Sequence, residues 1–449
     1  MPEHAGRRLA LVGLVALVSF IAFESIAVAT AMPEVARELS IGVSYALAFS
    51  LFLTGSLSGQ GAAGAWCDRT GPSPALLAGT AVFAAGLVAS GLAPGAGLLL
   101  AGRAVSGVGA GLVMVALYVV VAEVFDPAHR PKVFGLLSAA WVVPSLAGPL
   151  VAGWLATHVT WRAVFLLVAP LALVAAGIVV PVLRRLPARH GRLSTDVRRR
   201  TLWSMVLAAG ALLAPWGLRP GEDLWVRGVL VGGGLLLVGG SLPRLLPPGT
   251  LRGARGLPAV IGVRTVIAGA YFGSEAYLPL AMNTVRGMPL IDAGLALTGA
   301  SIGWAVGSWL QSRDPALGAD RVRWLLAGAL FVTVGVATLP STMLDAVTPW
   351  VVVLIWSCSA VGMGFAMSTS NVVVMALSEP EQTGRDGAAL QVGEALGSIT
   401  GVTLAGLLHN ELSVRLPEQA AYAALWWVLA GCALVGVWLA TRARPVRWT

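Results

Sequence analysis

Apolar segments long enough to cross a membrane recur along most of the 449-residue chain. A helix needs about 20 mostly apolar residues to span the hydrocarbon core of a bilayer. The sequence predicts fourteen such helices, near residues 9–31, 44–65, 75–93, 98–123, 132–156, 163–183, 201–218, 225–242, 258–281, 291–311, 324–340, 350–377, 387–409 and 420–440. We therefore expect an all-α polytopic membrane protein.

Composition excludes several other classes of protein. Apolar residues make up 57% of the chain and charged residues 11%, whereas soluble domains carry about 25% charged residues. Cys67, Cys358 and Cys432 lie far apart and lack metal-ligand spacing, so we expect neither a metal nor another cofactor. The net charge of +9 could suggest nucleic-acid binding. The sequence has no soluble segment in which basic and aromatic residues alternate, so nucleic acid is not an expected partner.

Basic residues predict the orientation. If the N-terminus is cytoplasmic, the loops that face the cytoplasm hold most of the 30 lysines and arginines, as the positive-inside rule requires. We therefore expect both termini on the cytoplasmic side of the cell inner (plasma) membrane. The first apolar run follows Arg7 and Arg8 without a signal-peptide cleavage pattern, and we expect it to be retained as a span.

The predicted helices form two blocks of six around a pair of extra helices. Glu24 and Glu275 occupy similar places in the first helix of each block, and Pro33 and Pro279 follow them. Parallel repeats related by an axis along the membrane normal are typical of transporters. The predicted parts are an N-terminal six-helix bundle (1–183), basic loops with two extra helices (184–257) and a C-terminal six-helix bundle (258–449).

Ionisable side chains are rare within the predicted helices. A charge at membrane depth costs roughly 2.5–3.5 kcal/mol on insertion scales, so such residues normally face a cavity or a partner. The residues concerned are Glu24, Arg103, Glu275 and Glu394, with Arg264 and Glu123 as further candidates. Because Glu24 and Arg103 lie at similar distances from the outer ends of their helices, we expect them to pair or to share water.

The same four residues, Glu24, Arg103, Glu275 and Glu394, are the candidates for proton coupling. Burial disfavours a charged carboxylate and a nearby arginine favours it, so a carboxylate that alternates between these settings binds and releases a proton. The alternative is a static Glu–Arg pair that only orders the helices.

Large side chains within the predicted helices are candidates for lining a substrate cavity. They are Tyr118, Trp141, Phe272, Trp304 and Met367. Such residues also pack against lipid or a neighbouring helix. Glycine-rich stretches around Gly107 and Gly148 allow helices to approach closely or to kink. Ordinary packing between membrane helices explains most of the 55 glycines.

Several short motifs accompany this helical pattern. The loop after the second predicted helix reads Gly64-Ala-Trp-Cys-Asp68-Arg69-Thr-Gly71. The fourth helix carries Leu99-x-x-x-Arg103-x-x-x-Gly107-x-Gly109-Ala110, and the fifth carries Pro144-x-x-x-Gly148-Pro149-x-x-Ala152-Gly153. The sixth opens with Trp161-Arg162-x-x-Phe165, and the penultimate helix opens with Arg385-Asp386-Gly387 and Gln391.

On these motifs the chain resembles the major facilitator superfamily, specifically its fourteen-span drug:proton antiporter group. The resemblance implies a major facilitator fold with two six-helix bundles and two extra linker helices. It also implies a role for Arg103 in proton transfer, a gating role for the loop of Asp68 and Arg69, and an antiport motif around Gly148 and Pro149.

The chain departs from the family pattern in three places. Pro72, Ser73 and Pro74 stand where the family usually has basic residues, and Pro144 and Ala152 replace two glycines of the antiport motif. Candidate substitute partners for the Asp68 loop are Glu123 or Asp126, with Arg130 and Lys132. Glu394 stands near a position that is often basic in relatives, which indicates a different cargo.

We expect a monomeric, proton-coupled efflux transporter of amphipathic, cationic or neutral small molecules, surrounded by membrane lipid. Proton binding to Glu24 or Glu275 would neutralise the site and release cargo during alternating access. The alternative on the same fold is an exporter or flippase of a lipid-like molecule or dedicated natural product. A membrane enzyme or receptor is disfavoured because the sequence lacks a Ser/His/Asp set, a phosphate loop and a metal cluster.

Overall fold

The computed structural model describes residues 3–126, 139–186, 195–217, 223–313, 321–379 and 382–444, together with residues 129, 133, 136 and 137. Within these ranges a helix occupies each of the fourteen predicted positions. The chain divides into two compact units. One comprises Met1–Gly217 and Leu224–Ser241, and the other comprises Leu218–Asp223 and Leu242–Thr449.

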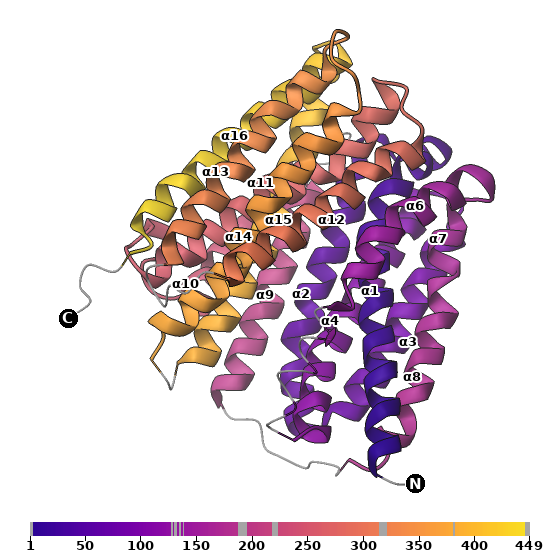
Figure 1. The fold of residues 1–449 in the computed structure, drawn as a ribbon, viewed down its shortest axis with the longest axis vertical. Helices are drawn as coiled ribbons and strands as arrows, with labels where there is room; N and C mark the ends of the chain where they lie inside the picture. The colour runs from indigo at the N-terminus through magenta and orange to yellow at the C-terminus, as the bar shows by residue number, and fades with distance from the viewer. Residues whose placement is uncertain are drawn as a thin grey trace. The chain divides into compact units, whose positions relative to one another are not determined.

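The first unit is built from helices, most of them long, that run alongside one another (Figure 1). They are α1 (Glu3–Leu39), α2 (Tyr45–Thr70), α3 (Pro72–Gly91), α4 (Ala96–Val124), α6 (Val142–His158), α7 (Arg162–Leu166), α8 (Val168–Leu183), α9 (Thr195–Gly217) and α10 (Leu224–Leu245). The last four residues of α10 belong to the second unit.

Among the residues that the structure describes, the second unit has six long helices and two short 3-10 turns. They are η2 (Thr250–Arg252), α11 (Leu257–Thr284), α12 (Leu290–Ser312), α13 (Val322–Thr338), η4 (Leu339–Met343), α14 (Val351–Leu377), α15 (Thr383–Leu412) and α16 (Glu418–Arg442).

The same neighbour relationships occur in both units. In the first unit α4 packs against α2 and α3, while α1 packs against α6 and α8. In the second unit α14 packs against α12 and α13, while α11 packs against α15 and α16. The internal repeat indicated by the sequence is therefore present in the packing of the helices.

Glycines set the closest helix approaches. A Cβ atom added at Gly107 of α4 would overlap the carbonyl oxygen of Phe52 on α2. In the second unit, a Cβ at Gly397 of α15 would overlap the carbonyl oxygen of Thr265 on α11. Small residues at helix crossings allow backbones to approach this closely in a membrane, where packing drives helix association.

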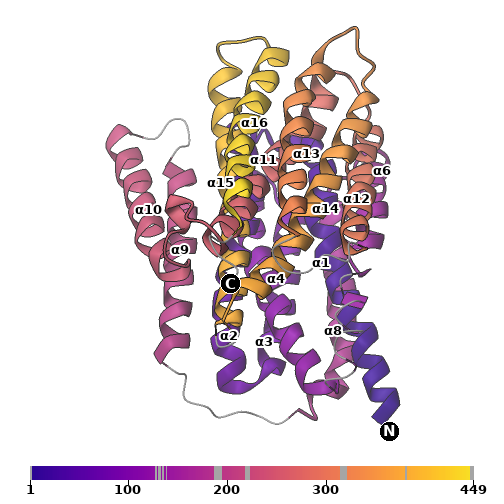
Figure 2. The ribbon, with the colours of Figure 1, turned by 60° about the vertical axis from the view of Figure 1, so that its left-hand side comes forward.

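The extra pair of helices packs on the rest of the first unit through α9, which contacts α2. Figure 2 shows α10 beside α9, and a Cβ at Gly210 of α9 would lie 2.7 Å from the carbonyl oxygen of Gly234 on α10. Trp225 and Leu236 on α10 are more than two-thirds exposed. This exposed apolar face suits contact with lipid.

Helix boundaries differ from the sequence-based expectation at several places, including α1, the sixth predicted helix and α9. α1 continues past Pro33 to Leu39, because a membrane helix tolerates proline when neighbouring groups satisfy the freed carbonyl. The sixth predicted helix is interrupted at Leu167, between α7 and α8. α9 begins at Thr195, so Arg198 and Arg199 lie in its first turns and not in the preceding loop.

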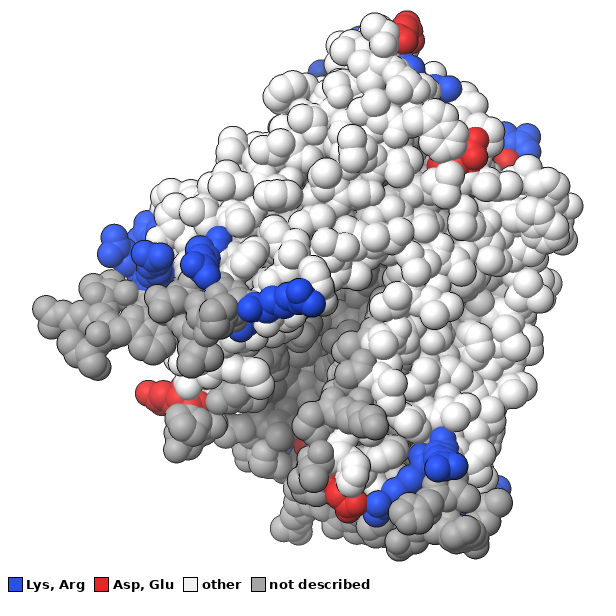
Figure 3. Space-filling view, in the orientation of Figure 1, with Lys and Arg blue, Asp and Glu red and all other residues white. Residues whose placement is uncertain are grey.

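Ten of the described helical segments combine the length and hydropathy of a membrane span. The helices α2, α6, α9 and α15 fall outside this set because they are shorter or carry more polar residues. Figure 3 shows that, on the face in view, the charged side chains of each unit gather toward the ends of its helices. The helix sides between them are uncharged, as in a multi-pass membrane protein.

Candidate transport site

A buried ion pair joins α1 to α4 in the first unit. Arg103 contacts the carboxylate of Glu24, and the two side chains are 2% and 0% exposed. The Nε of Arg103 donates to the carbonyl oxygen of Ala48 on α2 at 2.9 Å. Its guanidinium carbon also lies 4.6 Å from the ring centre of Phe52. The structure thus brings together the two residues that the sequence expected to pair, and Arg103 links three helices.

The glycine motifs of the first unit position this pair. Gly107 lies one turn after Arg103 and brings α4 against the Phe52 carbonyl, within reach of Ala48. In α6, Gly148 packs on Phe23, next to Glu24, and a Cβ there would lie 3.5 Å from the Phe23 ring. Pro149 and Gly153 are also buried in α6. These motif residues therefore support the helix turns that carry the charges.

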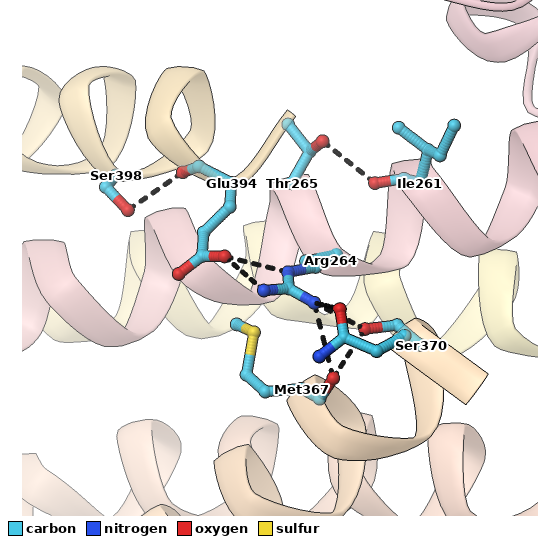
Figure 4. A network of polar contacts seen from close by, with 8 residues as sticks. Ile261, Arg264, Thr265, Met367, Ser370, Glu394 and Ser398 are labelled. Carbon is cyan, nitrogen blue, oxygen red and sulfur yellow. Dashed lines mark hydrogen bonds and ion pairs between the residues drawn. The ribbon is translucent and has the colours of Figure 1, made fainter. Parts of the chain in front are cut away.

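A second buried arginine joins three helices of the second unit. In Figure 4, Arg264 of α11 lies between Glu394 of α15 and the α14 residues Met367 and Ser370. Its Nε and Nη2 donate to one oxygen of Glu394 at 2.8 and 2.5 Å. Its Nη1 donates to the Met367 carbonyl at 3.3 Å, the Ser370 hydroxyl at 3.0 Å and the Asn371 amide oxygen at 2.8 Å.

Sequence reasoning placed Arg264 within a helix but did not pair it with Glu394. The sequence held a signal for this pair. Arg264 lies about six residues after the start of predicted helix 258–281, and Glu394 lies about seven residues after the start of predicted helix 387–409. Both helices begin on the same predicted side of the membrane, so the two residues differ by only about 1.5 Å in height. The glycines of α15 complete the arrangement, since Gly393 and Gly397 pack directly on Thr265. Met367 is 4% exposed and contributes its backbone carbonyl to this network.

Glu275 lies in an aromatic setting on α11. The hydroxyl of Tyr271 and the indole of Trp356 lie beside its carboxylate. Tyr271 stacks on Trp356 with ring centres 4.4 Å apart. Over the ranges that the structure describes, no ion pair to Glu275 occurs. Its setting therefore differs from that of Glu24 and Glu394, which each contact an arginine.

The aromatic candidates divide between the units. Phe272 and Trp304 lie together in the second unit, with ring centres 6.4 Å apart, and both are partly exposed. Tyr118 and Trp141 belong to the first unit, where Tyr118 is 46% exposed on α4. Trp141 precedes α6, and its carbonyl oxygen accepts a hydrogen bond from the Ser145 hydroxyl at 2.6 Å.

The loop motif forms the tight connection between α2 and α3. Gly71 has a φ of 85°, a left-handed conformation that favours glycine, and Pro72 begins α3. This geometry accounts for the proline that follows the motif. Asp68 and Arg69 are exposed at the end of α2, while a Cβ at Gly64 would meet no atom within 4 Å.

Two ion pairs at helix ends were missed by sequence reasoning. Asp126 pairs with Arg7 of α1 at 2.8 Å. Arg130 and Lys132, which the sequence grouped with Asp126 as candidate substitute partners for the Asp68 loop, lie outside the described residues. The other candidate acid, Glu123, is partly buried near the end of α4.

The second missed contact lies at the opposite end of α1. Glu38 accepts a hydrogen bond from the Trp161 indole at 2.7 Å and pairs with Arg162. The motif that opens the sixth predicted helix therefore ties α7 to α1. In the second unit, Arg385 is exposed in the first turn of α15, next to the buried Asp386.

Several relatives of similar sequence are named as transporters, an efflux pump or a resistance protein. The chain is 27% identical to an uncharacterized MFS-type transporter of Mycobacterium tuberculosis over 87% of its own length and 58% of the relative. It is 27% identical to the methylenomycin A resistance protein of Streptomyces coelicolor over 78% of the chain and 74% of the relative. It is 24% identical to the efflux pump aflT of Aspergillus parasiticus, over 76% and 68%. The chain thus spans little more than half the length of the mycobacterial relative.

Solved structures show the same fold. A bacterial homolog of the human lysosomal transporter Spinster matches with a TM-score of 0.67 and 15% identity, over 98% of this chain and 96% of that one. A peptide transporter POT structure matches with a TM-score of 0.69 and 16% identity, over 98% of both chains. The sequence signature of the Major Facilitator Superfamily matches residues 12–385. The chain therefore belongs to the Major Facilitator Superfamily and is a multi-pass membrane protein.

Proposed function

We propose that this chain is a proton-coupled exporter of amphipathic small molecules that works by alternating access. The observation that carries the proposal is the contrast among three carboxylates, those of Glu24, Glu275 and Glu394. Glu24 and Glu394 each contact an arginine, whereas Glu275 lies beside the aromatic residues Tyr271 and Trp356. The names of the relatives, which include an efflux pump and a resistance protein, support export as the direction.

Glu275 is the proposed coupling residue. Without an arginine to hold it charged, this carboxylate exchanges a proton more readily than one that remains ion-paired. Proton binding neutralises the group, weakens its attraction for cargo and favours release. Rocking of two six-helix bundles, 1–183 and 258–449, would then expose the site alternately to each side of the membrane.

Glu24 and Arg103 are proposed to respond to the same proton cycle. A proton on Glu24 would remove its charge and release Arg103 from the pair, which would loosen the junction of α1 with α4. Arg264 and Glu394 are proposed to have a structural function. The three acceptors on α14 hold Arg264 even when Glu394 is neutral.

The proposed protein works as a monomer in the cell inner membrane, with both termini in the cytoplasm. The positive-inside pattern of the basic residues supports this orientation. The extra helices, within 184–257, lie outside the proposed transport pathway, because α10 presents a large exposed apolar face.

Efflux from proteoliposomes tests the proposal. Liposomes containing the full chain and ethidium should release the dye faster when the outside is more acidic than the lumen. Glu275→Gln should release the dye at one slow rate with or without the gradient. Glu411→Gln, which alters a carboxylate that is 72% exposed, is the matched control and should respond like the unmodified protein. A full gradient response in both Glu24→Gln and Glu275→Gln would exclude these two residues from coupling.

A dedicated natural product is the second candidate cargo. One relative is the acurin A biosynthesis cluster MFS-type transporter of Aspergillus aculeatus, which is 28% identical over 44% of this chain, and another is named for resistance to methylenomycin A. A lipid-like molecule is a related alternative on the same fold. Efflux of one compound from a structurally diverse panel would favour a dedicated exporter, and efflux of many amphipathic compounds would favour the broader function.

A further inference from the structure

The connection between α10 and α11 packs on the end of α16. Gly253 and Gly256 of this connection have φ values of 57° and 82°, which favour glycine. A Cβ at Gly253 would lie 3.1 Å from the ring of Trp438 on α16. The backbone amide of Gly256 donates to the carbonyl oxygen of Arg442 at 3.0 Å. The connection is therefore held in one position against the last turn of α16.

Arginines gather at this contact. Arg252 and Arg255 are exposed on the connection, and the guanidinium carbon of Arg442 lies 4.7 Å from the centre of the Trp438 ring. Neither residues 242–274 nor residues 419–449 contain an aspartate or a glutamate. The positive charge is therefore not balanced by an acid of the same two segments. We call Arg252, Arg255, Trp438 and Arg442 the Trp438 site.

Trp438 lies at the depth of a membrane interface. It is 49% exposed, one helical turn before the end of α16 at Arg442. That end of α16 is on the predicted cytoplasmic side, where tryptophan rings typically lie between hydrocarbon and lipid headgroups. Leu251, on the connection, is 65% exposed beside Arg252. The site thus combines exposed apolar surface with arginines at headgroup level.

An exposed apolar row continues from Trp438 along α16. Trp427, Leu434 and Trp438 are each about half exposed, and spacings of seven and four residues place them on one helix face. Gly431 is exposed in the same row, and a Cβ there would meet no atom within 4 Å. The row therefore has a gap between Trp427 and Leu434. It is about 17 Å long, close to the roughly 15 Å of hydrocarbon in one leaflet.

We propose that the Trp438 site binds an anionic phospholipid, with its phosphate at the arginines and one acyl chain along the exposed row of α16. Guanidinium groups bind phosphate oxygens through paired hydrogen bonds, and basic sites beside membrane helices on the cytoplasmic side suit anionic headgroups. A soluble phosphate would meet the same arginines but would not cover the apolar row.

The bound lipid would join two elements of the second unit. Its phosphate would contact the connection through Arg252 and Arg255, and α16 through Arg442. A ligand that binds only the folded protein raises its stability. The lipid is thus proposed as a bound component on the exposed side of α16, separate from the exported cargo.

Two phospholipids with identical acyl chains test the preference for charge. Phosphatidylglycerol carries a net negative charge, whereas phosphatidylcholine carries none. Binding of each to the delipidated full chain in detergent should be measured by native mass spectrometry. Phosphatidylglycerol should bind at least about tenfold more tightly, and equal binding of the two lipids would overturn the proposal. Soluble glycerol phosphate should not displace the lipid at equal concentration, and displacement by it would overturn the role of the acyl chain.

A double variant locates the headgroup. Arg252→Gln combined with Arg255→Gln should remove most of the preference for phosphatidylglycerol, because each arginine near anionic lipid contributes about fivefold. The matched control combines Arg37→Gln with Arg415→Gln, which removes the same charge at positions 77% and 75% exposed. The control should keep the preference. Equal losses in the two double variants would mean that net charge, and not this site, binds the lipid.

Two further variants separate charge from ring contact. Arg252→Lys combined with Arg255→Lys keeps both charges and should retain most of the preference. Trp438→Leu should weaken both lipids by about threefold, whereas Trp225→Leu, at an exposed position on α10, should leave them unchanged. Unchanged lipid binding in Trp438→Leu would contradict the proposed row. Thermal unfolding identifies a variant that has lost its fold, and the lysine variant then still tests the arginines.

A lipid that is cargo would give a different pattern. Glu275→Gln should bind phosphatidylglycerol like the unmodified chain, because the Trp438 site lies on the exposed side of α16. Loss of lipid binding in Glu275→Gln, together with full binding when Arg252 and Arg255 are both glutamine, would overturn the Trp438 site in favour of lipid as cargo. Loss of the lipid preference only in the arginine variant supports the site, whether or not ethidium efflux depends on a proton gradient.

Discussion

Glu24 and Glu275 lie in the first helix of each repeat, yet Glu24 contacts Arg103 whereas Glu275 lies beside Tyr271 and Trp356. Two carboxylates at corresponding places thus have different partners. In the proposed mechanism, the second unit therefore exchanges the proton and binds the cargo. In the first unit, the junction between α1 and α4 depends on the contact of Glu24 with Arg103.

Arg103→Ala should strongly destabilise the first unit. The substitution leaves Glu24 buried without its partner, and removal of one member of a buried ion pair typically costs 3–5 kcal/mol. Thermal unfolding of the purified protein should show the loss. Arg415→Ala, which breaks an exposed contact to Glu411, should cost less than about 1 kcal/mol. Equal effects of the two substitutions would mean that the buried pair does not stabilise the bundle.

Gly107→Ala should destabilise the protein through a steric clash. Its added Cβ overlaps the Phe52 carbonyl oxygen, a backbone atom that moves only with α2, and overpacking of this kind typically costs about 1–3 kcal/mol. Gly64→Ala adds the same atom where nothing lies within 4 Å. It should leave the unfolding temperature unchanged or raise it. A similar decrease for both variants would contradict the glycine-mediated packing of α2 on α4.

Glu394→Gln should affect stability without removing the response to a pH gradient. Arg264 would keep its three acceptors on α14 but lose its charged partner on α15. A double-mutant cycle with Arg264→Gln should give a coupling energy of about 0.5–3 kcal/mol, the range for residues in direct contact. Loss of gradient-driven efflux in a stably folded Glu394→Gln protein would instead make this pair part of proton coupling.

The sequence predicts the helices well because membrane thickness sets their length. α12, expected over 291–311, extends from Leu290 to Ser312, and α14, expected over 350–377, begins at Val351 and ends at Leu377. The Glu24–Arg103 pair could also be anticipated, since two rare charges at one height have few other partners.

Contacts between helices were harder to predict. Helices that are apolar on all sides give little periodic signal of which face meets which neighbour. The Arg264–Glu394 network and the position of Trp356 beside Glu275 depend on that rotation. The pairing of Asp126 with Arg7 depends on how far α1 extends beyond its apolar run.

Proton movement driven by cargo tests the central claim most directly. Liposomes containing the full chain, an outward ethidium gradient and equal pH on both sides should acidify inside as dye leaves, reported by a lumenal pH dye. The Glu275→Gln protein should show no such acidification, and the Glu411→Gln control should behave like the unmodified protein. Dye efflux with no change in lumenal pH, or equal acidification in Glu275→Gln, would contradict proton exchange at Glu275.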